Sequence, residues 1–126
     1  MNRTAKEMNL NNTFYTNPHG LMDKFNKSTT NDQAQLSAYA MKNEEFRSIV
    51  CCKNYSCTVT NKHGVDKIMN WHNTNKLLEI KECLGIKTGI TSTAGPCLSS
   101  YFKLKDKKIV IVVFKAEGKE DRFKES

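Results

Sequence analysis

The chain has 126 residues, of which 38% are hydrophobic and 26% are charged, and its formal net charge is +7. This length suits one domain with a modest core, and the composition is that of a globular piece, not of a disordered tail. The longest apolar run covers residues 109–114, far short of the roughly 20 residues that a membrane-spanning helix needs.

The positive charge comes almost wholly from scattered lysines, and only three arginines are present. Surfaces that bind nucleic acid usually combine a basic stripe with arginines or aromatic residues. The one dense lysine cluster coincides with a predicted hairpin turn, so we interpret it as a solvated surface and expect no nucleic-acid partner. Its members are Lys103, Lys105, Lys107 and Lys108.

The five cysteines form no C-x-x-C pair, and His63 and His72 are too far apart to complete a zinc site. We therefore expect free or buried thiols, no metal and no other cofactor. Residues 1–6 lead into no apolar block, so we expect no signal peptide within this chain.

The predicted elements begin with a short helix over residues 2–9 and an extended loop over residues 13–21, which Asn17-Pro18 and His19-Gly20 punctuate. Thr30 and Gln33 have the spacing of a helix capping box. They open a predicted helix whose apolar residues recur at helical spacing. Those residues are Ala34, Ala38 and Met41, flanked by Leu36 and Tyr39. A second short helix is predicted over residues 44–50.

Two strands, 55–60 and 65–71, are predicted on either side of a turn-rich tetrad at 61–64. Residues 73–75 are predicted to cap a short helical turn. Three further strands, 84–91, 97–104 and 108–115, have connections short enough for antiparallel neighbours. The last of them is apolar at six successive positions, which predicts a central strand covered by helices on both faces. Residues 120–126 are predicted to form the first turn of another helix.

The most informative stretch is residues 85–95, which contains Lys87-Thr88-Gly89. It places a cation, a hydroxyl and a residue without a side chain in succession on a predicted strand. Such a group can hold a carboxylate beside an extended backbone, and a substrate strand can lie against Gly89 because it lacks a Cβ. Strict alternation sends Lys87 and Thr88 to opposite faces. Both reach one groove only if this strand lies at an edge or twists near Gly89.

Lys-Thr-Gly is also the third sequence element of penicillin-binding proteins and related β-lactamases, after Ser-x-x-Lys and Ser-x-Asn. With the segments around it, the chain resembles the D-alanyl-D-alanine carboxypeptidases, the low-molecular-mass penicillin-binding proteins, over nearly its whole length. This resemblance implies an α+β fold in which helices cover an antiparallel sheet. It further implies that residues 1–126 form a single partial domain, an incomplete penicillin-binding-protein or β-lactamase-like transpeptidase domain. The matching segments are residues 1–5, 12–14, 17–21, 28–32, 71–78, 85–98 and 122–126.

The activity that the resemblance implies is serine-type acyl transfer on peptidoglycan stem peptides. A serine attacks the carbonyl between two terminal D-alanines, and water then hydrolyses the acyl-enzyme. By resemblance Lys87 polarises the site, Thr88 hydrogen-bonds the substrate, and Arg122 helps to hold the terminal carboxylate through its planar fork. An ordinary surface role for Arg122, in a charged terminus, is an equally open interpretation. Members of the family are exported, and the compartment of this chain stays open.

The chain departs from the family at the nucleophile. It contains no Ser-x-Asn, and its one Ser-x-x-Lys, Ser100 to Lys103, lies on a predicted strand. Positions three apart on a strand face opposite sides, whereas the chemistry needs them as neighbours on a helix. We therefore expect no catalytic residue here, with the helical lobe that carries the serine absent from this sequence, and we expect exposed apolar surfaces.

Three interpretations stay open: an incomplete piece of an ordinary enzyme, a pseudoenzyme that still binds peptide carboxylates, and a subunit that completes a split active site. In each of them the expected ligand is a D-Ala-D-Ala-terminated peptide, or a β-lactam once the site is complete. The expected ligand-binding residues are Lys87, Thr88, Gly89 and Arg122.

Overall fold

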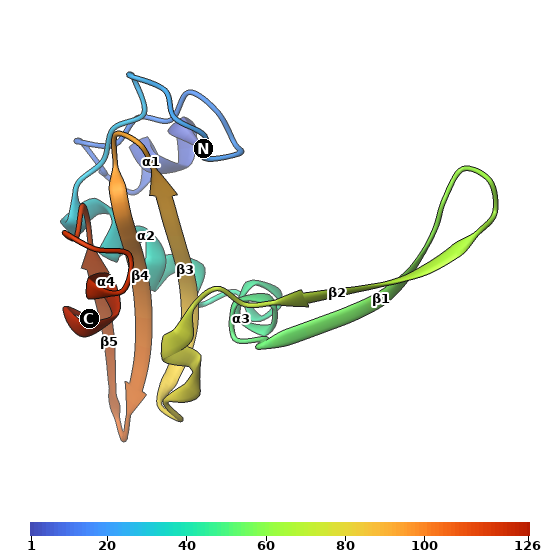
Figure 1. Ribbon diagram of the computed structural model, residues 1–126. Coiled ribbons are helices and arrows are strands. Elements are labelled where there is room, and N and C mark those ends of the chain that lie inside the picture. The colour runs from blue at the N-terminus through green and yellow to red at the C-terminus, as the bar shows by residue number, and fades with distance from the viewer.

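The computed structural model describes all residues, 1–126, and its body is a three-stranded antiparallel sheet in the order β3-β4-β5 (Figure 1). These strands are β3 (Cys83–Thr91), β4 (Gly95–Leu104) and β5 (Lys107–Val113). They confirm the three predicted strands and their antiparallel pairing. Together with the helices described next, the sheet confirms the predicted α+β class.

Helices cover the sheet on two sides. The helices α2 (Thr30–Ala40) and α3 (Glu44–Val50) contact β5, β4 and β3, while the short helices η1 (Lys76–Glu79) and α4 (Asp121–Lys124) contact β3 and β4. Two small cores result. One gathers Leu98 with residues of η1, and the other gathers Tyr101 with Met41 at the end of α2. Because side chains alternate along β4, Leu98 and Tyr101 point to opposite faces of the sheet.

The strands β1 (Asn54–Thr60) and β2 (Asp66–His72) form a separate antiparallel hairpin that projects away from the body (Figure 1). This confirms the two predicted strands and the turn between them. Tyr55 pairs with Trp71 near the base of the hairpin, with ring centroids 5.9 Å apart. The hairpin leads through the loop at residues 73–75 directly into η1. The end of β2 therefore determines where this loop begins.

The N-terminal helix α1 (Asn2–Glu7) and α3 lie where the sequence predicts them, but α2 differs in detail. Its N-cap is Thr29, one residue before the predicted capping box, and the Thr29 hydroxyl accepts from the Asp32 amide. Gln33 does not return to the cap. Its side chain instead donates to Tyr15 Oη at 2.6 Å and to Ser28 Oγ at 2.9 Å. These hydroxyls of the folded loop compete with the backbone at the start of the helix for the Gln33 side chain.

The loop that precedes α2 is held by a buried carboxylate. Asp32 is 3% exposed and accepts from the Asn12 amide at 3.0 Å and from Thr13 Oγ1 at 2.7 Å. Phe14 and Lys27 form a short antiparallel bridge that closes the loop between them. These contacts fix residues 12–28 against the body, including His19 and Gly20, which reach the cleft described below.

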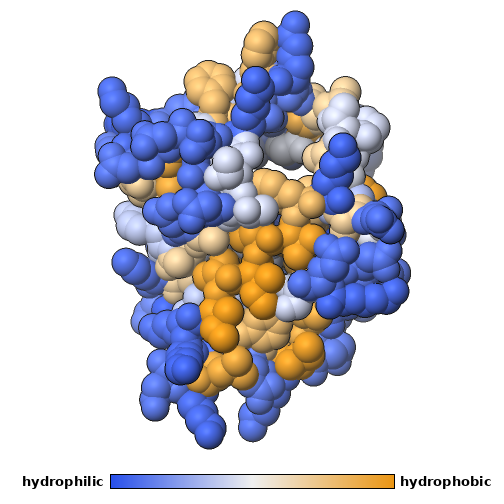
Figure 2. Space-filling view, turned by 90° about the vertical axis from the view of Figure 1, so that its left-hand side faces the viewer, coloured by the Kyte–Doolittle hydropathy of each residue, from blue (hydrophilic) through white to orange (hydrophobic).

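The prediction that the strand over residues 108–115 is central is wrong. β5 pairs only with β4 and forms one edge of the sheet, and β4 is the central strand. Ile109 is 37% exposed and Phe114 is 40% exposed. Figure 2 shows the corresponding side of the molecule, where an apolar area is ringed by hydrophilic residues. An apolar run indicates that a strand favours burial. The position of that strand in the sheet depends instead on which other strands are available to pair with it.

None of the helices has the length and the apolar run that crossing a bilayer requires. The five cysteines form no disulfide, and Cys83 is the buried one among them.

Candidate active-site cleft

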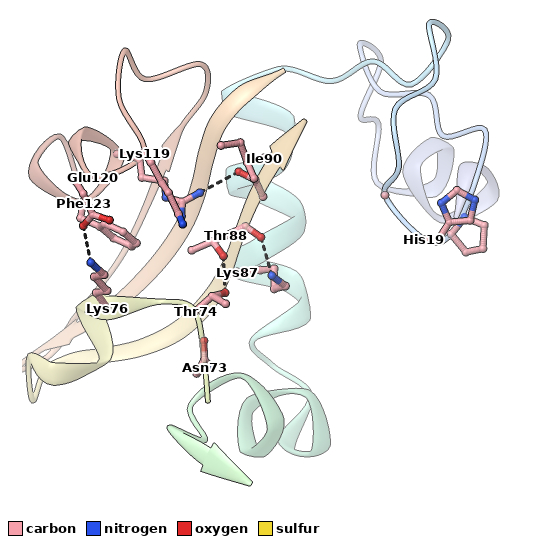
Figure 3. Close-up of a pocket in the computed structure, with 14 residues that line it drawn as sticks. His19, Asn73, Thr74, Lys76, Lys87, Thr88, Ile90, Lys119, Glu120 and Phe123 are labelled. Atoms are coloured by element: carbon pink, nitrogen blue, oxygen red, sulfur yellow. Dashed lines mark hydrogen bonds and ion pairs between the residues drawn. The ribbon is translucent and has the colours of Figure 1, made fainter. Parts of the chain in front are cut away.

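A cleft of about 790 Å³ lies along the free edge of β3, between η1, α4 and the N-terminal loop. Figure 3 shows how its residues lie: Lys87, Thr88 and Ile90 come from β3, Asn73 and Thr74 from the loop after β2, and His19 from the loop on the far side. Segments widely separated in the sequence therefore meet at one strand edge.

The structure resolves how Lys87 and Thr88 both line this cleft. β3 pairs with β4 on one side only, so the cleft lies at its open edge and receives side chains from both faces. Lys87 Nζ bends back and donates to the Thr88 carbonyl at 2.7 Å. The Thr88 side chain is turned inward, with Oγ1 2.6 Å from Thr74 Oγ1. Nothing lies within 4 Å of the position that a Cβ on Gly89 would take, so the strand is open to a ligand there.

Arg122 is not a surface residue of a charged terminus. It is 4% exposed, and its Nη1 donates to the Gly89 carbonyl at 3.0 Å and to the Cys97 carbonyl at 3.4 Å. The guanidinium also lies 4.9 Å from the ring centroid of Phe123, its neighbour on α4. Its Nε is buried without a partner, so the protein itself does not saturate this group. The structure thus brings all four predicted binding residues to one site.

Several residues of the cleft receive no binding role from the sequence. Lys76 Nζ and Glu120 Oε2 form an ion pair at 2.7 Å that joins η1 to α4 across the cleft (Figure 3). These residues are 44 positions apart, so no local pattern predicts the pair. Thr74 belongs to a matching segment and to a predicted helix cap, and neither predicts its contact with Thr88. His19, which the sequence assigns to a turn, lines the cleft as well.

The cleft is strongly positive. Lys76, Lys87, Lys119 and Arg122 line it, against a single acidic residue, Glu120. Partial burial lowers the pKa of Lys87 below its ordinary value, and the nearby positive charge of Arg122 lowers it further. The hydrogen bond from Lys76 lowers the pKa of Glu120, which keeps that carboxylate ionised and paired. Of these cations only Lys76 is paired with an acid, so the site suits an anionic ligand.

Ser100, the serine of the one Ser-x-x-Lys motif, lies outside this cleft. It is fully buried in β4, where its Oγ donates to the Ile111 carbonyl and lies 2.5 Å from Ser126 Oγ. Lys103 is exposed on the same strand. The two residues therefore do not form the lysine-activated pair that this four-residue motif forms on a helix.

Comparison with known proteins agrees with this geometry. A sequence profile of the D-alanyl-D-alanine carboxypeptidases matches residues 1–118. The chain belongs to the D-alanyl-D-alanine carboxypeptidase family. It is 35% identical to the D-alanyl-D-alanine carboxypeptidase of Streptomyces sp. strain K15 over 100 residues, and 31% identical to the carboxypeptidase DacF of Bacillus subtilis over 124 residues. These matches cover 78% and 97% of this chain, and 34% and 31% of those relatives.

Solved structures of the family superpose on nearly the whole chain. The DD-transpeptidase of Streptomyces K15 matches with a TM-score of 0.92 and 30% identity, over 98% of this chain and 48% of the other. Penicillin-binding protein D2 of Listeria monocytogenes, in its cefotaxime-bound form, matches with a TM-score of 0.73 and 29% identity, over 98% of this chain and 49% of the other. The chain thus spans about half the length of these family structures and about a third of the curated relatives.

Proposed function

We propose that this chain forms the carboxylate-binding wall of a serine-type D-Ala-D-Ala carboxypeptidase site and does not carry out acyl transfer by itself. The observation that carries the proposal is the convergence of Lys87, Thr88 and the buried Arg122 on the open edge of β3. Residues from two distant parts of the chain meet there, and each is of a type that binds a carboxylate.

Each group has a distinct task in this proposal. Arg122 supplies fixed positive charge behind Gly89, because its contacts with two carbonyls hold the guanidinium in place. Thr88 supplies a hydroxyl at the wall of the cleft. Lys87 supplies a second cation, which has to leave the Thr88 carbonyl to reach a ligand. The freed carbonyl then becomes available to an extended peptide that pairs with the edge of β3.

The acyl-transfer step needs a nucleophile that we assign to other polypeptide. In the proposed reaction the serine oxygen attacks the penultimate D-alanine carbonyl, and terminal D-alanine leaves as its amine takes up a proton. Water then cleaves the resulting ester. The residues of this chain bind the carboxylate of the terminal D-alanine and align the peptide. This lowers the activation barrier because the reactants are held in position.

Fluorescent penicillin labelling tests the inactivity of the chain on its own. The Listeria relative binds cefotaxime, so a β-lactam is a suitable probe for a complete site. We expect no covalent adduct on the purified chain after denaturing electrophoresis, and an adduct on a complete carboxypeptidase run beside it. An adduct on the chain itself would contradict the proposal.

Binding is tested with an N-acetylated peptide that ends in D-Ala-D-Ala, titrated against the wild type and Lys87→Ala. We expect Lys87→Ala to bind roughly tenfold more weakly, because a charge-assisted contact is lost. The matched control is Lys67→Ala on the projecting hairpin, which should bind like the wild type. Equal affinities for Lys87→Ala and the wild type, or no binding by the wild type, would remove the binding role.

The lowered pKa of Lys87 predicts how binding depends on pH. The ligand carboxylate stays ionised above pH 5, so only the loss of the lysine proton weakens the contact as pH rises. Because burial and Arg122 lower the pKa of Lys87, the affinity should begin to fall at a lower pH than for an ordinary lysine. Lys87→Arg should abolish this early fall, since arginine stays protonated. Peptide affinities of the wild type and Lys87→Arg, measured from pH 7 to 10, check this prediction. Identical pH profiles for the two proteins would contradict it.

A second candidate is a subunit that completes a split active site. The exposed apolar area over β5 favours it, because a free strand edge with apolar side chains can pair with another strand. The labelling experiment separates the candidates when the N-terminal half of a related DD-peptidase is added. Label that appears only in the mixture, on the added polypeptide, supports the split site, whereas peptide binding without any label supports a non-catalytic binding protein.

A further inference from the structure

Two threonine hydroxyls meet at the wall of the cleft. Thr74 Oγ1 and Thr88 Oγ1 lie 2.6 Å apart, and neither has another hydrogen-bond partner in the protein (Figure 3). Thr88 is 8% exposed, whereas Thr74 is exposed to solvent. The largely buried hydroxyl on β3 therefore lies beside an exposed hydroxyl at the wall of the cleft.

The loop that carries Thr74 is held rigidly on both sides. Before it, Asn73 donates through Nδ2 to the carbonyls of Val50 and Cys52, at 3.2 and 3.0 Å. After it, the buried Asn75 caps η1 by accepting from the Leu77 amide at 3.1 Å. Thr74 thus has little freedom to move away from Thr88, and the short contact between the hydroxyls is imposed by the fold.

The direction of this hydrogen bond decides what the cleft offers to an anion. Each hydroxyl has one proton and two acceptor lone pairs. If Thr88 donates to Thr74, the buried hydroxyl presents only lone pairs to the cleft, and these repel a carboxylate. If Thr74 donates to Thr88, the Thr88 proton is free to point into the cleft. The exposed Thr74 oxygen then accepts from water at little cost.

We propose that Thr74 is a positioning residue that donates its proton to Thr88 and thereby turns the Thr88 hydroxyl into a donor for the ligand carboxylate. This inference rests on the proposed carboxylate-binding function. It adds a residue that acts through Thr88 and determines whether the cleft distinguishes a free carboxylate from a neutral end group. A carboxylate can only accept hydrogen bonds, whereas a primary amide can also donate to a Thr88 hydroxyl that presents lone pairs.

The test compares two N-acetylated peptides that end in D-Ala-D-Ala, one with a free carboxylate and one with a C-terminal amide. Thr74→Val removes the proton while nearly preserving shape, and Thr74→Ser keeps the hydroxyl. We expect Thr74→Val to bind the acid roughly fivefold more weakly and the amide within about twofold of the wild type. Thr74→Ser should bind both like the wild type. Thr58→Val, on the hairpin, is the control for the same substitution away from the cleft.

The acid-to-amide preference separates positioning from a structural role. The inference would be overturned if Thr74→Val weakened binding of the acid and the amide by the same factor, so that the wild-type preference for the acid remained. The proposed function would then stay intact. A wild type that shows no preference for the acid would overturn the proposed function, and this inference with it. Circular dichroism of each variant confirms that the comparison is made between folded proteins.

Discussion

Arg122→Ala is expected to weaken binding of a D-Ala-D-Ala peptide by roughly 100-fold and to lower the free energy of unfolding by about 2 kcal/mol. Both effects have one cause. The buried guanidinium donates to the carbonyls of Gly89 and Cys97, which lie opposite each other on β3 and β4. Alanine leaves these carbonyls without that donor, opens space beneath the cleft and removes its most fixed positive charge.

Peptide titration and urea unfolding measure the two effects on the same samples. Arg122→Lys should retain part of the affinity, because it keeps the charge and loses the planar fork. Arg3→Ala is the matched control, since the Arg3 side chain is 90% exposed and pairs only with Glu7 on α1. Arg122→Ala could instead show the peptide affinity and the unfolding midpoint of the wild type. In that case the buried contacts of Arg122 would contribute to neither binding nor stability.

Leu98→Ala is expected to cost about 3 kcal/mol of stability, because it truncates an almost fully buried leucine. Leu98 is 1% exposed on the central strand and packs with Leu77, Leu78 and Cys83 in the core beneath η1. That core is small, so few neighbours are able to close over the cavity that alanine leaves. The substitution should also loosen η1, and with it the loop that carries Thr74.

Unfolding followed by circular dichroism checks this expectation, with Leu104→Ala as the control. Leu104 is on the same strand and is 44% exposed, so its truncation should change stability by less than about 1 kcal/mol. Similar losses for the two variants would mean that the core around Leu98 does not dominate the stability of the sheet.

Peptide affinity and stability should separate in these two variants. Arg122→Ala alters the cleft directly, whereas Leu98→Ala acts through the packing that supports it. At a temperature where Leu98→Ala is still folded, we expect this variant to keep a peptide affinity near that of the wild type. Arg122→Ala should lose more affinity than Leu98→Ala does. The reverse order would indicate that carboxylate binding depends on the position of η1 more than on the guanidinium.

Local chemistry allowed much of this fold to be predicted from the sequence. Helix α3, the β1–β2 hairpin and the three strands of the main sheet lie within a few residues of their predicted bounds. Capping residues, turn formers and apolar spacing act between neighbours in the chain, so their signals survive without tertiary context. The Lys-Thr-Gly element, together with the run that follows it and the other matching segments, likewise indicated the family and the strand that lines the cleft.

Contacts between distant segments decided the rest. Whether β5 is central or at an edge depends on which strands are present to pair with it, and an apolar run carries no such information. The burial of Arg122 beneath Gly89, the Lys76–Glu120 ion pair and the Thr74–Thr88 contact each join residues more than ten positions apart. No local pattern encodes these meetings. The sequence alone therefore determined the family and the elements, while the tertiary structure determined which side chains share the cleft and which of them are free to meet a ligand.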